Sequence, residues 1–173
     1  TGQLASLMQV VGGQQGQMET ARQQQRTDEQ AFTFFVRVKA FAEAQGYLAQ
    51  LEQMSGQEWW QEDPRPWQLL SDCGELYEGL EDLDTALSYY DRAIQELETR
   101  RALLSRDELK TALAADKGAQ YLYFQAARSA LKLAASADDG GDAERIAAQA
   151  YSYAERGKAR ALLDLMVGSA AVA

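Results

Sequence analysis

The stretch Trp67–Glu98, WQLLSDCGELYEGLEDLDTALSYYDRAIQELE, decides the fold of this 173-residue chain. Its apolar and small residues recur every three or four positions, and the polar pair Glu81 and Asp82 interrupts them once. This spacing predicts one helix face on each side of the break. Small residues alternate with large ones, so two helix backbones can approach while a neighbouring tyrosine fills the space beside them. The stretch therefore predicts two short helices packed together and joined by a tight turn.

The same stretch resembles a tetratricopeptide repeat (TPR) over about 34 residues. The matching positions are Leu70, Gly74, Tyr77, Ala86, Tyr90 and Ala93. Cys73 stands where the family usually has Leu, and Glu98 stands where it often has Pro. The resemblance implies an all-α fold, a TPR-like superhelix in which antiparallel helix hairpins stack as a right-handed solenoid.

A second, longer hairpin is expected over residues 105–173. Gly118 and Tyr121 repeat the Gly and Tyr of the first hairpin at a spacing of 44, whereas Ala147, Tyr151 and Ala154 repeat its Ala, Tyr and Ala at a spacing of 61. The first helix is predicted over about 106–135, with Ser105 and Glu108 as its capping box. A loop over residues 136–142 follows, and Asp142 is the expected cap of the final helix.

The end of the chain, AYSYAERGKARALLDLM, resembles the last TPR helix that precedes a caspase-like CHAT protease domain. The matching residues are Ala154, Glu155, Arg156, Lys158, Ala159, Arg160, Ala161, Leu162, Leu163, Asp164 and Leu165. This resemblance implies a regulatory segment whose final helix couples to a neighbouring protease domain. Arg156, Lys158 and Arg160 would then be exposed here and covered in the larger protein.

The first part of the chain predicts a helical arm or a degenerate repeat over residues 1–54. Apolar residues keep a helical period through 17–54. Gly46 either lies within one long helix, where it costs about 1 kcal/mol against Ala, or marks a turn or a close helix contact. Residues 1–16 are either the end of a preceding repeat or a frayed tail. The aromatic cluster of Phe32, Phe34 and Phe35 is explained by core packing or, less simply, by a docking patch. Residues 55–66, SGQEWWQEDPRP, form a loop in which Trp59 and Trp60 are candidates for packing or for a partner contact.

The charge distribution argues against nucleic acid and membrane surfaces as partners. The net charge is −9, and it is concentrated in residues 67–104, which carry 9 acidic and 3 basic residues. Residues 105–173 carry 9 of each. An acidic module repels phosphate backbones and anionic lipids and suits a basic peptide, although a solvated helix surface is the simpler explanation of the charge.

The residue types needed for catalysis are scarce. The chain has no His and one Cys, Cys73, which is expected on a buried helix face without a base beside it. The acidic loop at residues 136–142 lacks the spacing of a calcium-binding EF-hand loop. We therefore expect no enzyme activity, no metal and no cofactor. The single Cys excludes an internal disulfide and favours a reducing, cytoplasmic (intracellular) location.

Three functions remain open. The first is a protein- or peptide-binding module, in which the TPR resemblance places Gln68, Ser71, Glu75 and Glu78 in a groove that accepts a basic or amphipathic segment. The second is the regulatory segment of a TPR-CHAT protease. The third is self-association through the apolar residues of the last helix, Leu162, Leu163, Leu165 and Met166.

Overall fold

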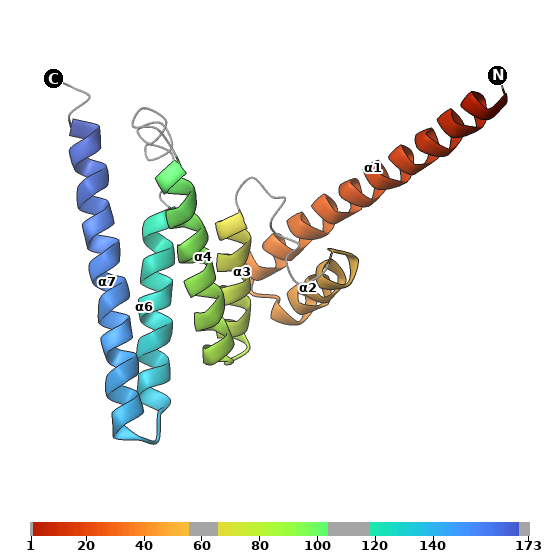
Figure 1. Ribbon diagram of the computed structural model, residues 1–173. Helices are drawn as coiled ribbons and strands as arrows, with labels where there is room; N and C mark the ends of the chain where they lie inside the picture. Colours follow the sequence, from red (N-terminus) through yellow and green to blue (C-terminus); the bar gives the residue numbers. More distant parts are fainter. Residues whose placement is uncertain (1, 56–65, 104–117, 170–173) are drawn as a thin grey trace. The chain divides into compact units, whose positions relative to one another are not determined.

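The computed structural model describes residues 2–55, 66–103 and 118–169, and the side chains of residues 16, 19–54, 66–103 and 118–162. The described part of the chain contains six helices and no strand, which confirms the all-α class (Figure 1). Two compact units divide the chain, Thr1–Trp59 and Trp60–Ala173, and each is described by itself. The predicted cap at Ser105 and Glu108, and both Trp59 and Trp60, lie outside the described residues.

The first unit is a helix pair made of α1 (Gly2–Arg37) and the shorter α2 (Phe41–Ser55). α1 extends well beyond the end of its partner (Figure 1). The buried apolar residues lie in α2 and in the adjoining end of α1 and are Phe32, Val36, Ala44, Leu48 and Leu51. Of the aromatic cluster, Phe32 is in this core, Phe35 stacks on Tyr47, and Phe34 is exposed. Core packing therefore explains Phe32 and Phe35 but not the exposed Phe34.

The helix break in this unit lies seven residues before the glycine that marked it in the sequence. Neither alternative for residues 17–54, one continuous helix or a turn at Gly46, is correct, because the chain turns between α1 and α2 at Lys39, which has a φ of 60°. The amide of Lys39 donates to Val36 and the amide of Ala40 to Phe35, the two bonds of a Schellman helix end. Gly46 lies inside α2 with open space around it, so it marks neither a turn nor a close helix contact.

The second unit begins with the predicted helix pair, α3 (Pro66–Gly79) and α4 (Leu83–Leu103). Its turn repeats the Schellman geometry: the amide of Asp82 donates to Tyr77, that of Glu81 donates to Glu78, and Glu81 has a φ of 65°. The Asp82 carboxylate then accepts the amide of Thr85 and caps α4. The polar pair at 81–82 thus ends one helix and begins the next.

Close packing of α3 on α4 depends on a glycine. A Cβ added to Gly74 would lie 2.5 Å from Cε1 of Tyr90, and real Cβ atoms do not approach so closely. Tyr90 is fully buried, together with Ala86 and Ala93 on the same face of α4. The alternation of small and large residues predicted for this pair is therefore how the two helices fit together.

The second helix pair consists of α6 (Gly118–Ser136) and α7 (Gly140–Ser169), and it uses a different register from the one predicted. Tyr121 and Tyr151 are exposed, and the tyrosines that pack inside are Tyr123 and Tyr153. Gly118 is exposed, while Ala147 and Ala154 are half-buried. The close approach is made by Gly157, whose added Cβ would lie 3.0 Å from Cβ of Tyr123. Here the glycine is on the second helix and the tyrosine on the first.

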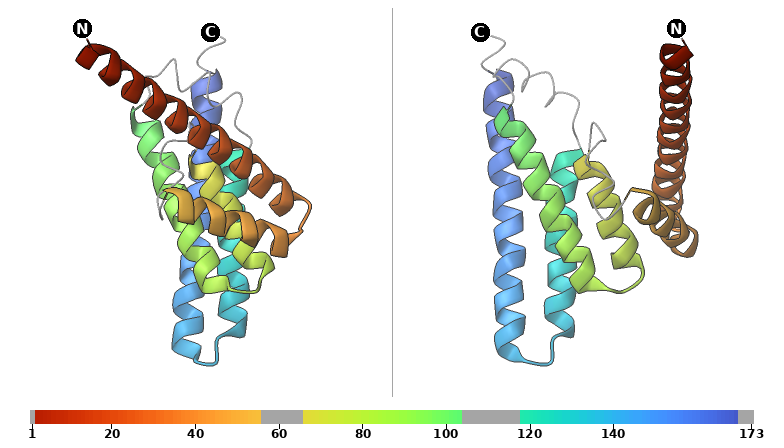
Figure 2. Two further views of the ribbon diagram at one scale, coloured as in Figure 1. Left: turned by 90° about the vertical axis from the view of Figure 1, so that its right-hand side faces the viewer. Right: turned by 45° about the vertical axis from the view of Figure 1, so that its right-hand side comes forward.

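The turn into α7 also differs from the prediction. Asp139, not Asp142, caps the helix, because its carboxylate accepts the amide of Gly141 and its carbonyl accepts that of Ala143. Asp142 instead pairs with Arg145 one turn further on. Within this unit α6 packs chiefly on α7 and α4 and touches α3 along one edge (Figure 2).

Candidate functional site

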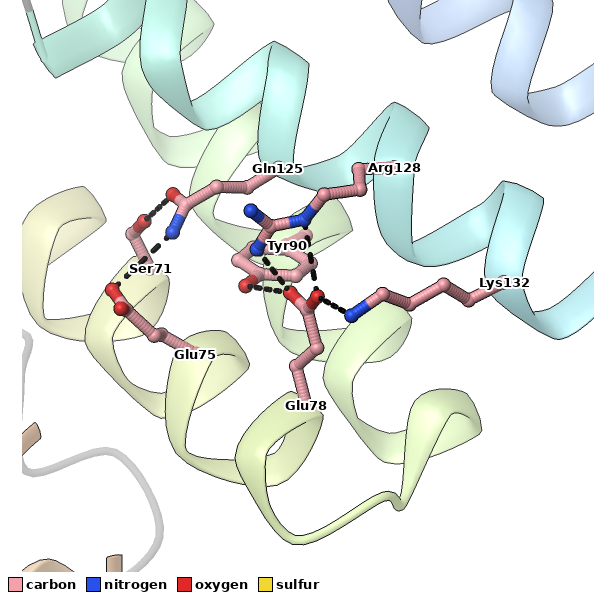
Figure 3. Close-up of polar contacts among 7 residues, drawn as sticks. All are labelled: Ser71, Glu75, Glu78, Tyr90, Gln125, Arg128 and Lys132. Atoms are coloured by element: carbon pink, nitrogen blue, oxygen red, sulfur yellow. Dashed lines mark hydrogen bonds and ion pairs between the residues drawn. The ribbon is translucent and has the colours of Figure 1, made fainter. Parts of the chain in front are cut away.

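The α3–α6 junction is the densest polar cluster between the two helix pairs of the second unit. We use this name for the seven residues drawn in Figure 3, which are Ser71, Glu75, Glu78, Tyr90, Gln125, Arg128 and Lys132. Residues 71, 75 and 78 of α3 form hydrogen bonds with residues 125, 128 and 132 of α6, and the partners follow the same order along both helices. The two helices therefore run parallel.

Glu78 is the centre of the junction. Its Oε1 accepts bonds from Nε of Arg128 at 3.1 Å and from Nζ of Lys132 at 2.7 Å. Its Oε2 accepts bonds from Nη2 of Arg128 at 2.9 Å and from the hydroxyl of Tyr90 at 3.1 Å. A carboxylate offers about four acceptor sites, so Glu78 has no capacity left for a ligand. It joins α3 to α4 through Tyr90 and to α6 through the two cations.

The environment keeps Glu78 charged. Burial alone would raise its pKa, but the bonds and charges of Arg128 and Lys132 outweigh burial and place the pKa below its ordinary value. The bond to Glu78 raises the pKa of Arg128. Burial, followed by the nearby charge of Glu78, raises the pKa of Tyr90 far above its usual range. Glu78, Arg128 and Tyr90 therefore each keep one protonation state near neutral pH, which suits a structural clamp and not a proton-transfer site.

Glu75 lies one turn before Glu78 and has a weaker set of contacts. The side-chain amide of Gln125 donates to Glu75 at 3.3 Å and accepts a bond from Ser71 at 3.2 Å. Gln125 is fully buried, whereas Ser71 and Glu75 are half-buried. Within the described part of the chain this neutral amide is the only hydrogen-bond partner of Glu75, and no cation pairs with it. Glu75 thus brings an uncompensated negative charge to the edge of the junction.

Acidic residues of the first helix pair also bind the second helix pair from α4. Glu98 accepts the hydroxyl of Tyr123 and pairs with Arg160, whose Nε lies 2.9 Å away. Asp91 accepts the hydroxyl of Tyr153 at 2.6 Å. Together with Glu75 and Glu78, four of the nine acidic residues of 67–104 therefore bond to donors or cations of α6 and α7. These acidic residues therefore have a structural role, whereas the sequence had suggested that their charge serves to bind a basic peptide.

The four predicted groove residues do not form one solvated face. Gln68, Ser71 and Glu75 are half-buried. Glu78 is buried and saturated, so the expectation that it lies on a solvated face is wrong. Residue spacing located these positions on α3, but it carried no information about Arg128 and Lys132, which lie 50 and 54 residues further along the chain.

The residues of the last helix that were predicted to contact a partner lie in different environments. Arg160 is not free, since it pairs with Glu98. The guanidinium of Arg156 lies over the ring of Tyr123 at 5.6 Å, and Lys158 pairs with Glu155 on the surface. Leu162 is exposed. The side chains of Leu163, Leu165 and Met166 lie outside the described set.

α6 carries an exposed apolar stripe that was not among the binding residues predicted from the sequence. Tyr121, Phe124 and Leu131 are 51%, 58% and 57% exposed, and their spacing, with Arg128 between the last two, places them on one helix face. The rings of Tyr121 and Phe124 stack at 6.3 Å, and the guanidinium of Arg128 lies over Phe124 at 5.9 Å. We call these three residues the α6 stripe. The sequence of α6 contains more large apolar residues than one buried helix face can hold, and this excess could have predicted the stripe.

The described residues hold no cluster of His, Cys, Asp or Glu that could bind a metal ion, and Cys73 is buried. Within the same residues, no helix is both long enough and apolar enough to span a bilayer. Comparisons with protein-family models, with curated proteins and with solved structures found no match for this chain.

Proposed function

We propose that this chain is a non-catalytic helical-repeat module that binds a protein or peptide, of the kind that the TPR resemblance implies. The observation that carries the proposal is the α6 stripe. Two aromatic rings and a leucine lie exposed on a helix whose opposite face is well packed. Monomeric proteins rarely expose large apolar patches, and an exposed apolar patch often marks an interaction surface.

The saturated polar contacts support the same proposal from another direction. The clamp at Glu78 and the contacts of Asp91 and Glu98 hold the two helix pairs of the second unit together from within. A firmly joined pair of hairpins presents the α6 stripe on a rigid surface, which lowers the ordering cost of binding. Glu78 takes no part in the proposed binding, since its acceptor sites are occupied.

The test is selection of peptides from a displayed library on the full 173-residue chain, followed by affinity measurements with variants. The proposal predicts that Phe124→Ser weakens the selected peptides at least about ten-fold, because exposed aromatic residues dominate binding energies. Tyr151→Ser is the matched control, since Tyr151 is a 68% exposed aromatic residue on a different helix, α7, and the substitution should leave affinity unchanged. A library that yields no ligand beyond those of an unrelated helical protein would contradict the proposal.

Self-association is the second candidate, and the outer face of α7 favours it. Leu162, one of the residues predicted for this role, is 61% exposed. Light scattering across a concentration series tests this candidate. A dimer that Leu162→Ser dissociates would support it, and a monomer at all concentrations would remove it. The role as the regulatory segment of a TPR-CHAT protease stays a prediction from the final helix alone.

A further inference from the structure

The charges beside the α6 stripe allow a more specific inference, which rests on the proposed function. The stripe runs from Tyr121 to Leu131, ten residues or about 15 Å along the helix. This length fits about three turns of a partner helix with apolar side chains three or four residues apart. The edge of α6 that faces α3 carries the polar residues, Gln125, Arg128 and Lys132 (Figure 3).

The two ends of this polar edge have opposite charge. Glu75 lies beside Gln125 and has no cation paired with it in the described part of the chain. Arg128 and Lys132 share the single carboxylate of Glu78, so the group of three keeps one excess positive charge. Lys132 is 53% exposed and is the outermost of them. The negative end at Gln125 and the positive end at Lys132 are seven residues apart, about 10 Å along α6.

We propose that the α6 stripe binds an amphipathic helix of a partner protein that carries one basic and one acidic residue about two turns apart. The apolar face of this helix covers Tyr121, Phe124 and Leu131. Its basic side chain pairs with Glu75, and its acidic side chain meets the excess positive charge at Lys132. A helix with two basic or two acidic residues at these positions satisfies one end of the edge and is repelled at the other.

Three stapled helical peptides of about 18 residues test the proposal, because a staple supplies the helix that so short a peptide does not hold alone. They share a leucine face and differ only at two positions seven residues apart, which carry Lys and Glu, Lys and Lys, or Glu and Glu. Isothermal titration with the full chain should rank the Lys and Glu peptide tightest by about two- to five-fold, the contribution of an exposed ion pair. Glu75→Gln should remove its advantage over the Glu and Glu peptide. Phe124→Ser should weaken all three, and Tyr151→Ser should change none.

The outcomes separate the inference from the proposed function. Equal affinity of the three peptides, or an advantage that persists in Glu75→Gln, overturns the inference. Failure of all three also overturns it, and the displayed library then decides the proposed function: selected ligands that Phe124→Ser weakens would preserve that function, and their absence would end it. Circular dichroism of each variant verifies that the helices remain folded, as expected for substitutions at the exposed Phe124 and Tyr151 and for a conservative change at the half-buried Glu75.

Discussion

Replacing Glu78 with Ala tests whether the α3–α6 junction is a structural clamp. The substitution removes all four hydrogen bonds and leaves the buried hydroxyl of Tyr90 without its charged acceptor. Losing such an acceptor costs about 1–3 kcal/mol. The two ion pairs add less than a fully buried pair would, because Arg128 and Lys132 are 39% and 53% exposed and can return to water. At about 0.5–1 kcal/mol each, they bring the expected loss to about 3 kcal/mol.

The assay is urea denaturation of the full chain followed by circular dichroism. Glu75→Gln is the control, since it removes a negative charge three residues away but keeps a side-chain oxygen that can accept the 3.3 Å bond from the buried amide of Gln125. It should cost no more than about 0.5 kcal/mol. A double-mutant cycle with Tyr90→Phe should show coupling of about 1 kcal/mol, because the two side chains share a buried bond. Equal losses for the variants at Glu78 and Glu75 would refute the clamp.

Three further predictions concern stability. Gly74→Ala should destabilise the chain by about 1–3 kcal/mol, because the new Cβ would overlap Tyr90. Gly46→Ala should stabilise its helix by about 1 kcal/mol, because Gly46 lies in α2 with open space around it. Thermal denaturation should show opposite shifts for the two variants, and a loss of stability in Gly46→Ala would contradict the reasoning. Glu81→Gly and Lys39→Gly should each stabilise by about 1 kcal/mol, since a residue with a Cβ is strained at φ values of 65° and 60°, and unchanged urea midpoints would count against this. The stability difference between the native chain and Glu78→Gln should stay constant from pH 7 down to about 4.5 and shrink below that pH. The reason is that a carboxyl group with a lowered pKa stabilises the fold above its ordinary pKa of 4.5, and this stabilisation is lost as the pH falls through the pKa of the folded state. A difference that does not depend on pH would exclude the charged clamp.

Local spacing predicted the all-α class and the α3–α4 pair because the contacts involved are close in sequence. The helix break at 81–82, the close approach of Gly74 and the buried face with Tyr90 all follow from a helical period and one turn. The break before α2 was missed because Lys39 takes a left-handed conformation that usually signals itself with glycine.

Contacts between the two helix pairs could not be predicted in the same way. Spacing alone made Tyr121 and Tyr151 equivalent to buried tyrosines, yet the second pair places its glycine, Gly157, on the opposite helix and buries Tyr123 instead. The junction depended on side chains 50 or more residues apart, so the sequence showed Glu78 as an acidic surface residue and gave no sign of its partners. Four of the nine acidic residues of 67–104 contact α6 or α7, and they are Glu75, Glu78, Asp91 and Glu98. The α6 stripe therefore becomes the surface to test.

Chemical-shift mapping by NMR tests the central claim most directly, with the full chain titrated by a peptide selected from the displayed library. We predict that the signals of Tyr121, Phe124 and Leu131 shift together and saturate at one affinity, while those of Tyr151 and Leu162 on α7 remain in place. Shifts confined to α7, with the α6 stripe unchanged, would contradict the claim that this stripe is the binding surface.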